Sequence, residues 1–249
     1  MTSRWLFPAV AGLALVAGSA QAQGSVSIIP MASYVTSGGD WIKPTAVNGL
    51  AGPTPGTFTY GLKPGGGISV GVIAELSMSK SLSLAAQVGR TLGGMQTLEE
   101  NYFSSGASGT GNVFTVDMAT TNLGAMLVFR PLGRTPSGAP KTLYLELGGG
   151  VNIYNVSQGF TSAGATNTDV FSYDYSTPAL MAGLGFSFPV GRRVSLQLFG
   201  RGYYQLSEYD AGVLASSGDV NQTSLTQISS AQGEKTMLFQ FGAGLMVGR

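Results

Sequence analysis

The side chains that could do chemistry in this chain are restricted in type, because its 249 residues include no histidine and no cysteine. Without an imidazole, a serine cannot be activated as it is in Ser-His hydrolases. Without His or Cys, nearly every transition-metal site is also excluded. The acidic pairs Glu99-Glu100 and Glu208-x-Asp210 remain, and we expect them to be solvated loop charges. The sequence therefore predicts neither an enzyme nor a cofactor.

Two glycine runs, Gly65-Gly66-Gly67 and Gly148-Gly149-Gly150, are the other candidates for chemistry. Neither has the lysine and Ser/Thr of a phosphate-binding loop, nor a helix pattern after it. We interpret them as strand glycines that let neighbouring backbones approach closely.

Charges are rare inside segments that alternate between apolar and small polar residues. Around Arg201, for example, Val194, Leu196 and Leu198 alternate with Ser195 and Gln197. Alternation predicts a β-strand with two unlike faces. A face in contact with water would carry roughly a quarter charged residues, whereas these segments hold chiefly Glu75, Glu146 and Arg201. The apolar phase is therefore expected to face lipid and the polar phase the inside of a barrel.

Eight such segments follow one another along the chain. The predicted strands are Val26–Thr36, Gly67–Met78, Leu82–Leu92, Phe114–Phe129, Thr142–Asn155, Ser176–Phe188, Val194–Leu206 and Thr236–Val247. Short turns at one end alternate with long polar loops at the other. The predicted long loops are Ser37–Gly66, Gly93–Val113, Val156–Tyr175 and Ser207–Lys235. This alternation is typical of outer-membrane barrels; a soluble lipocalin-like barrel has no reason to segregate its loops by length. The predicted fold is all-β, an eight-stranded antiparallel up-and-down transmembrane β-barrel.

The N-terminus has the pattern of an export signal. Arg4 precedes the apolar stretch Trp5–Val16, and Ala20-Gln21-Ala22 is a small-residue cleavage site. The apolar stretch is shorter than the ~20 residues of a spanning helix. We expect residues 1–22 to be a cleaved signal peptide and residues 23–249 to form the barrel domain in a bacterial outer membrane.

Charge separates between the two ends of the expected barrel. The short-turn end has basic residues only, namely Lys80, Arg130, Arg134, Lys141, Arg192, Arg193 and Arg249. The long loops are mainly acidic, and the candidate extracellular acidic residues are Glu99, Glu100, Asp169, Asp174, Glu208 and Asp210. Such loops can hold divalent cations between lipopolysaccharide phosphates, or a surface ligand. With a formal net charge of +1, the chain lacks the basic face of a nucleic-acid-binding protein.

Aromatic residues gather near both ends of the predicted strands, as the interface girdles of membrane barrels do. They are Phe129, Phe186 and Phe188 towards the short turns, and Tyr34, Trp41, Tyr60, Phe114, Tyr173, Tyr175, Tyr204 and Tyr209 towards the long loops.

Over the length after residue 22, the chain resembles the small outer-membrane β-barrel superfamily that includes the transmembrane domain of outer-membrane protein A, the outer-membrane protein X type and the opacity adhesins. The resemblance is carried by Ile28-Ile29-Pro30-Met31, by Ser79-Lys80-Ser81-Leu82-Ser83-Leu84, and by the last strand, Met237-Leu238-Phe239-Gln240-Phe241-Gly242-Ala243-Gly244-Leu245. Members usually end on an aromatic residue, whereas this chain ends Met246-Val247-Gly248-Arg249.

The last candidate residues are those expected to line the barrel interior. An eight-stranded barrel is about wide enough to be filled by its own side chains. The expected polar network of the lumen consists of Glu75, Glu146, Arg201, Gln87, Gln197 and Gln240. Because an isolated buried charge is unfavourable, we expect Arg201 to pair with one or both glutamates. These features favour a structural or surface-interaction role carried by the four loops; the alternative is a small porin or a channel for a small, apolar ligand.

Overall fold

A computed structural model describes residues 25–48, 56–62, 64, 66–92, 94–99, 102–104, 107–109, 112–133, 143–162, 168–191, 194–210 and 233–247. The elements in these ranges are thirteen β-strands. Within them, no helix has the length and apolar character needed to cross a membrane.

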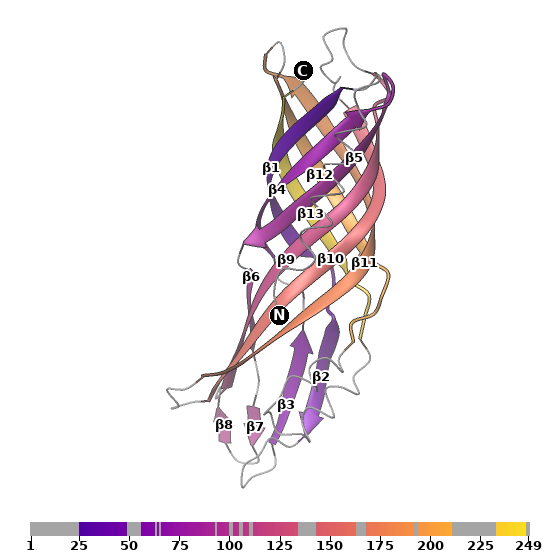
Figure 1. Cartoon of the computed structure of the whole chain (residues 1–249). Helices are drawn as coiled ribbons and strands as arrows, with labels where there is room; N and C mark the ends of the chain where they lie inside the picture. Colours follow the sequence, from indigo (N-terminus) through magenta and orange to yellow (C-terminus); the bar gives the residue numbers. More distant parts are fainter. Residues whose placement is uncertain are drawn as a thin grey trace.

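Eight of the strands close into one antiparallel barrel (Figure 1), which confirms the predicted fold class. They are β1 (Val26–Ser37), β4 (Gly67–Ser77), β5 (Leu82–Leu92), β9 (Asn112–Phe129), β10 (Leu143–Ser162), β11 (Thr168–Pro189), β12 (Val194–Gln205) and β13 (Met237–Val247). Each strand pairs with its neighbours in the chain, and β1 pairs with β13 to complete the ring. The up-and-down order follows from the short turns, which can join only antiparallel neighbours.

The barrel wall is much taller on one side than on the other. Strands β9, β10 and β11 contain 18, 20 and 22 residues, whereas β4 and β5 contain 11 each. The predicted loop Val156–Tyr175 is therefore wrong: β10 and β11 stay in register from Asn155↔Asp174 out to Thr161↔Thr168. The sequence hid this extension because its outward positions, such as Ser172 and Asp174, carry polar residues.

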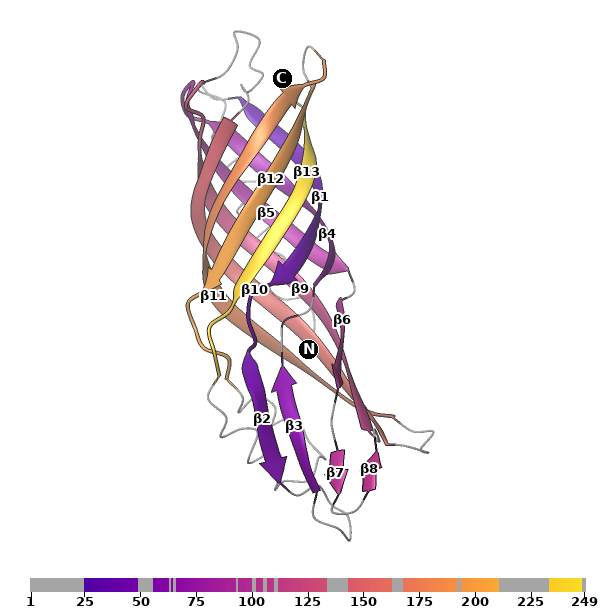
Figure 2. The same ribbon diagram turned by 180° about the vertical axis from the view of Figure 1, so that it is seen from behind.

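Two other predicted loops also contain strands. β2 (Ile42–Asn48) and β3 (Gly56–Leu62) lie within Ser37–Gly66, and β6 (Gly94–Glu99), β7 (Tyr102–Ser104) and β8 (Ala107–Gly109) lie within Gly93–Val113. β6 adds to the extended part of β9, while β2, β3, β7 and β8 form a second, four-stranded sheet beyond the barrel mouth (Figure 2). In Figures 1 and 2 this sheet lies at the same end of the barrel as the extensions of β9, β10 and β11.

The barrel has an apolar outside and a polar inside. Outward side chains such as Leu147, Ile68 and Phe241 are 68%, 62% and 57% exposed. Inward charged residues such as Glu75 and Arg201 are each only 2% exposed. This polarity is the reverse of that of a soluble β-barrel, whose apolar side chains face the interior.

The glycine run of β10 brings two strands close together. A Cβ atom on Gly148 or Gly150 would collide with the backbone carbonyl oxygen of Ala125 or Leu123 on β9. Glycine is required there because the neighbouring backbone occupies the side-chain position, as the sequence interpretation proposed.

Candidate functional site

The centre of the lumen holds a buried ion pair. The guanidinium of Arg201 on β12 donates from Nε to Glu146 Oε2 at 2.6 Å and from Nη2 to Glu146 Oε1 at 2.9 Å. Glu146 lies on β10, and the two residues are 2% and 6% exposed. Such a two-point contact compensates both charges for the loss of water.

Hydrogen bonds continue from this pair around the barrel wall. Arg201 Nη1 donates to Gln87 Oε1 at 3.0 Å, and Gln87 Nε2 donates to the hydroxyl of Tyr203 at 2.8 Å. The Tyr203 hydroxyl donates to Gln240 Oε1 at 2.7 Å, and Gln240 Nε2 donates to Ser33 Oγ at 2.8 Å. The chain of contacts links β10, β12, β5, β13 and β1, so the lumen side chains cross-link walls that are not neighbours in the sheet.

A second ion pair lies nearer the short turns. Arg130 Nη2 donates to Glu75 Oε2 at 2.8 Å, and Arg130 Nη1 donates to Ser83 Oγ at 3.2 Å. The guanidinium also lies 5.5 Å from the ring centroid of Tyr144. The expected pairing of Arg201 with one or both glutamates is confirmed by its contact with Glu146. One expectation is corrected: Arg130 is 1% exposed rather than a surface residue of the turn, and it pairs with Glu75.

The position of Arg130 follows from the backbone. Its N–H donates to the carbonyl oxygen of Ser81 at 2.7 Å, so the β5–β9 ladder continues one residue past the last residue of β9. Arg130 thereby continues the inward phase of Met126 and Val128, both 2% exposed. The repeat of two could have shown this, because Arg130 lies two residues beyond Val128.

The remaining lumen residues are also placed inside. Gln197 Nε2 donates to the sulfur of Met246 at 3.3 Å, and Asn122 Nδ2 donates to Asn152 Oδ1 at 2.6 Å. A cavity beside Gln87 and Asn152 has a volume of only about 10 Å³, close to that of a single water molecule. At this level the lumen is filled by side chains.

An aromatic cluster fills the barrel mouth on the loop side. Trp41, which follows β1, is fully buried and stacks on Tyr209 with ring centroids 4.7 Å apart. Tyr154 and Tyr175 meet the indole edge-on at 4.6 and 5.6 Å. We call Trp41, Tyr154, Tyr173, Tyr175 and Tyr209 the mouth cluster.

Hydrogen bonds fix the mouth cluster to the wall. Trp41 Nε1 donates to Gln205 Oε1 at 3.2 Å, and Gln205 Nε2 donates to the Tyr154 hydroxyl. The hydroxyls of Tyr173 and Tyr209 lie 2.8 Å apart and share a hydrogen bond. Burial raises the pKa of Tyr173 to about 12, because the phenolate would lose its hydration there.

These positions correct the expected aromatic girdle at the loop end. Trp41, Tyr173, Tyr175 and Tyr209 are between 0% and 8% exposed and point inward, whereas Tyr34 and Tyr204 are 55% and 43% exposed. Tyr60 and Phe114 have side chains outside the described residues. At the short-turn end, Phe129, Phe186 and Phe188 are exposed on the outside, as expected of a girdle.

The structure describes part of the acidic candidate set. Asp174 accepts a hydrogen bond from Asn155 Nδ2 at 2.8 Å on the outer wall, and Glu208 and Asp210 are exposed after β12. Glu100 and the side chains of Glu99 and Asp169 lie outside the described residues. Within the described residues, no group of three acidic side chains is arranged to hold a metal ion.

The structure describes part of the basic end. Lys80 is exposed in the turn between β4 and β5, whereas Arg134, Lys141, Arg192, Arg193 and Arg249 lie outside the described residues. One outward cation was missed by the sequence reasoning: Arg90 on β5 is exposed, and its Nη1 donates to Thr121 Oγ1 at 3.3 Å. Arg90 lies six residues after the outward Leu84, so a repeat of two places both side chains on the outer face, and the sequence could have shown this.

Comparisons with known proteins give structural neighbours only. No family model matches the sequence, and no curated protein matches it. Neisserial surface protein A is 15% identical, with a TM-score of 0.42, and the match covers 91% of this chain and 97% of that one. Ail, the attachment invasion locus protein of Yersinia pestis, solved with the heparin analogue sucrose octasulfate, is 13% identical over 90% and 97%, with a TM-score of 0.40.

A major outer membrane protein from Thermus thermophilus is 14% identical over 89% of this chain and 99% of that one, with a TM-score of 0.47. The closed barrel of this chain is shown by its own ladder of backbone hydrogen bonds.

Proposed function

We propose that this chain is a bacterial outer-membrane barrel with a structural or surface-interaction role, and that its loop-side extension carries any recognition. The observation that carries this proposal is the reversed polarity of the wall. Exposed apolar side chains surround the barrel, while two ion pairs lie inside it. Contiguous apolar surface on this scale is unfavourable in water and favourable in lipid.

The height of the apolar surface supports a membrane-spanning barrel. On β11 the outward residues from Pro178 to Phe188 are apolar, and Ser176 and Asp174 follow on the loop side. Ten steps of ~3.3 Å at a tilt near 40° give a height of roughly 25 Å, the thickness of the apolar band on outer-membrane barrels. Arg90 and Asp174 then lie near the loop-side boundary, where polar groups are tolerated.

The chain reaches that membrane, in this proposal, by export with residues 1–22 as a removable signal peptide. Its partners are the surrounding lipid and lipopolysaccharide, together with divalent cations or a surface ligand at the acidic positions. The filled lumen and the absence of His and Cys from the sequence favour a non-enzymatic protein.

Single-channel recording distinguishes a structural barrel from a pore. The chain from residue 23 onward, refolded from urea into vesicles and fused with a planar bilayer, should insert without steady openings, since side chains fill the lumen. A matched control removes lumen side chains with Gln87→Ala and Tyr203→Ala together. Steady openings of the unsubstituted chain, in proportion to inserted protein, would show that it is a channel.

A further inference from the structure

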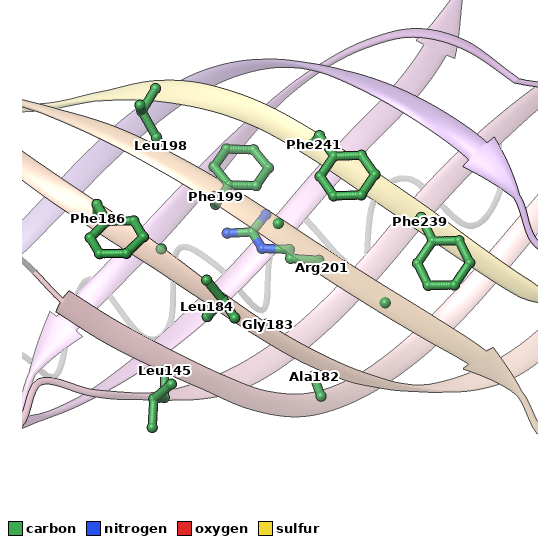
Figure 3. Close-up of a pocket in the computed structure, with 13 residues that line it drawn as sticks. Leu145, Ala182, Gly183, Leu184, Phe186, Leu198, Phe199, Arg201, Phe239 and Phe241 are labelled. Atoms are coloured by element: carbon green, nitrogen blue, oxygen red, sulfur yellow. The ribbon is translucent and has the colours of Figure 1, made fainter.

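The outer wall of the barrel is interrupted by a groove across β11, β12 and β13 (Figure 3). Its volume is about 610 Å³. It exists because three outward positions lack a large side chain: Ala182 on β11, and Gly200 and Gly202 on β12. Outward positions next to this gap carry large side chains, namely Leu198 and Tyr204 on β12 and Leu180 and Leu184 on β11, so the groove is a local gap in an apolar surface.

The walls of the groove are apolar side chains from the flanking strands. Phe239 and Phe241 on β13 line one side, and Leu184 and Phe186 on β11 line the other. Figure 3 shows Leu198 near one end of the groove. Rings and branched aliphatic groups of this kind contact hydrocarbon well and offer no hydrogen bond.

The floor of the groove offers no polar side chain either. Arg201 lies behind it, but its guanidinium faces the lumen and is bound to Glu146 and Gln87. Any occupant therefore meets an apolar surface on three sides.

The groove has the width of one hydrocarbon chain. Neighbouring strands lie ~4.8 Å apart, so the walls on β11 and β13 stand roughly 10 Å apart, and their side chains narrow the gap further. Along β12 the gap runs from Leu198 to Tyr204, which is roughly 20 Å between Cα atoms. A slot of this size offers on the order of 10² Å², well below the ~800 Å² per partner of a stable protein interface.

We propose that this groove binds one acyl chain of a membrane lipid as a retained, slowly exchanging ligand. The proposal rests on the membrane-spanning barrel proposed above. The apolar band that surrounds the groove contacts hydrocarbon, and an acyl chain fits the slot, whereas a second copy of the protein would need more area than the slot supplies.

The test compares lipid retention by a groove-filling variant and by a matched control. In Gly202→Leu, the new Cβ would lie 3.8 Å from Phe239, an ordinary contact, so the barrel should accept it while the side chain fills the slot. Ala125→Leu adds the same side chain at an exposed outward position of β9, away from the groove. Ala182→Leu fills the slot from the other wall and serves if Gly202→Leu does not fold.

Both measurements use phosphatidylcholine vesicles containing the refolded chain from residue 23. Native mass spectrometry after transfer to detergent should show a retained phospholipid on the unsubstituted chain and on Ala125→Leu, and loss of that adduct in Gly202→Leu. Electron spin resonance of a phosphatidylcholine labelled near its methyl end should show fewer immobilised lipids in Gly202→Leu than in the other two.

Equal retention by all three proteins, or no retained lipid on the unsubstituted chain, would overturn the proposal. A dimer that Gly202→Leu dissociates would assign the groove to a second copy and would overturn it as well. A chain that fails to enter vesicles would instead contradict the membrane-spanning barrel itself.

Discussion

Removing Arg201 should destabilise the barrel through one carboxylate only, that of Glu146. Arg201→Met keeps the length of the side chain and leaves the Glu146 carboxylate buried without its partner. Breaking a buried ion pair in this way costs about 3–5 kcal/mol. Glu146→Gln should cost a similar amount, because it leaves the guanidinium without a counter-ion.

The double variant Arg201→Met/Glu146→Gln removes both charges, so it should be more stable than the sum of the two single losses by at least about 2 kcal/mol. Glu75 supplies the contrast. Because its partner is Arg130 at 2.8 Å, Glu75→Gln and Arg201→Met should add to within about 0.5 kcal/mol.

Urea unfolding from lipid vesicles, followed by fluorescence, measures these differences. The sequence has two tryptophans, Trp5 and Trp41. In the chain from residue 23 onward, all tryptophan fluorescence therefore comes from Trp41 in the mouth cluster. Gln197→Met is the control, since Gln197 is buried on the same strand and its amide donates only to a weakly accepting sulfur. Strong coupling of Arg201 to Glu75, or none to Glu146, would refute the assignment of partners.

Three further predictions test the outer wall, the glycine contacts and the mouth cluster. Leu184→Arg, near the middle of the apolar band, should lower the free energy of unfolding from vesicles by about 2–4 kcal/mol, whereas Leu196→Arg, close to the short turns, should lower it by about 0–1 kcal/mol. Equal losses would mean that the band is placed wrongly. Gly150→Ala should prevent folding, seen as loss of the heat-dependent shift in gel mobility, because its Cβ meets the Leu123 backbone, while Gly202→Ala should fold normally. Normal folding of Gly150→Ala would contradict the close β9–β10 contact. Because the pKa of Tyr173 rises from 10 to about 12 on folding, its contribution to stability is complete below pH 10 and is lost as the pH rises towards 12. Trp41 emission should therefore change between pH 10 and 12 as the mouth cluster loosens, and Tyr173→Phe should remove part of that change in emission.

Much of the barrel could be predicted from the sequence, because two unlike faces impose a repeat of two on every membrane-facing segment. The bounds of β5 agree with the prediction at both ends, and those of β1, β4, β12 and β13 agree within one residue. Where the wall leaves the apolar band, as at Asp174, the outward positions carry polar residues and the repeat loses the apolar phase that faces lipid. The extensions of β10 and β11 could not be recognised for that reason.

The inward residues and the pairing of Arg201 with a glutamate could be predicted, whereas the pairing of Arg130 with Glu75 could not. The inward phase correctly places Glu75, Glu146, Arg201 and Gln240 in the lumen, because phase depends only on spacing. The choice of partners depends on strand stagger around the closed ring, which local spacing does not encode. Trp41 was assigned to the membrane interface for a related reason: its inward position depends on how the chain after β1 folds back over the mouth.

The unequal height of the wall sets how a surface partner would meet this protein. β11 continues for ten residues past Pro178 to Thr168, which at the tilt of the barrel is a further reach of roughly 25 Å. The extended parts of β9, β10 and β11, with β6 paired to β9, form a hydrogen-bonded sheet that holds its tip at that distance as a stiff stalk rather than as a tethered loop. A surface ligand of the kind proposed above would therefore lose little conformational entropy on binding at the tip.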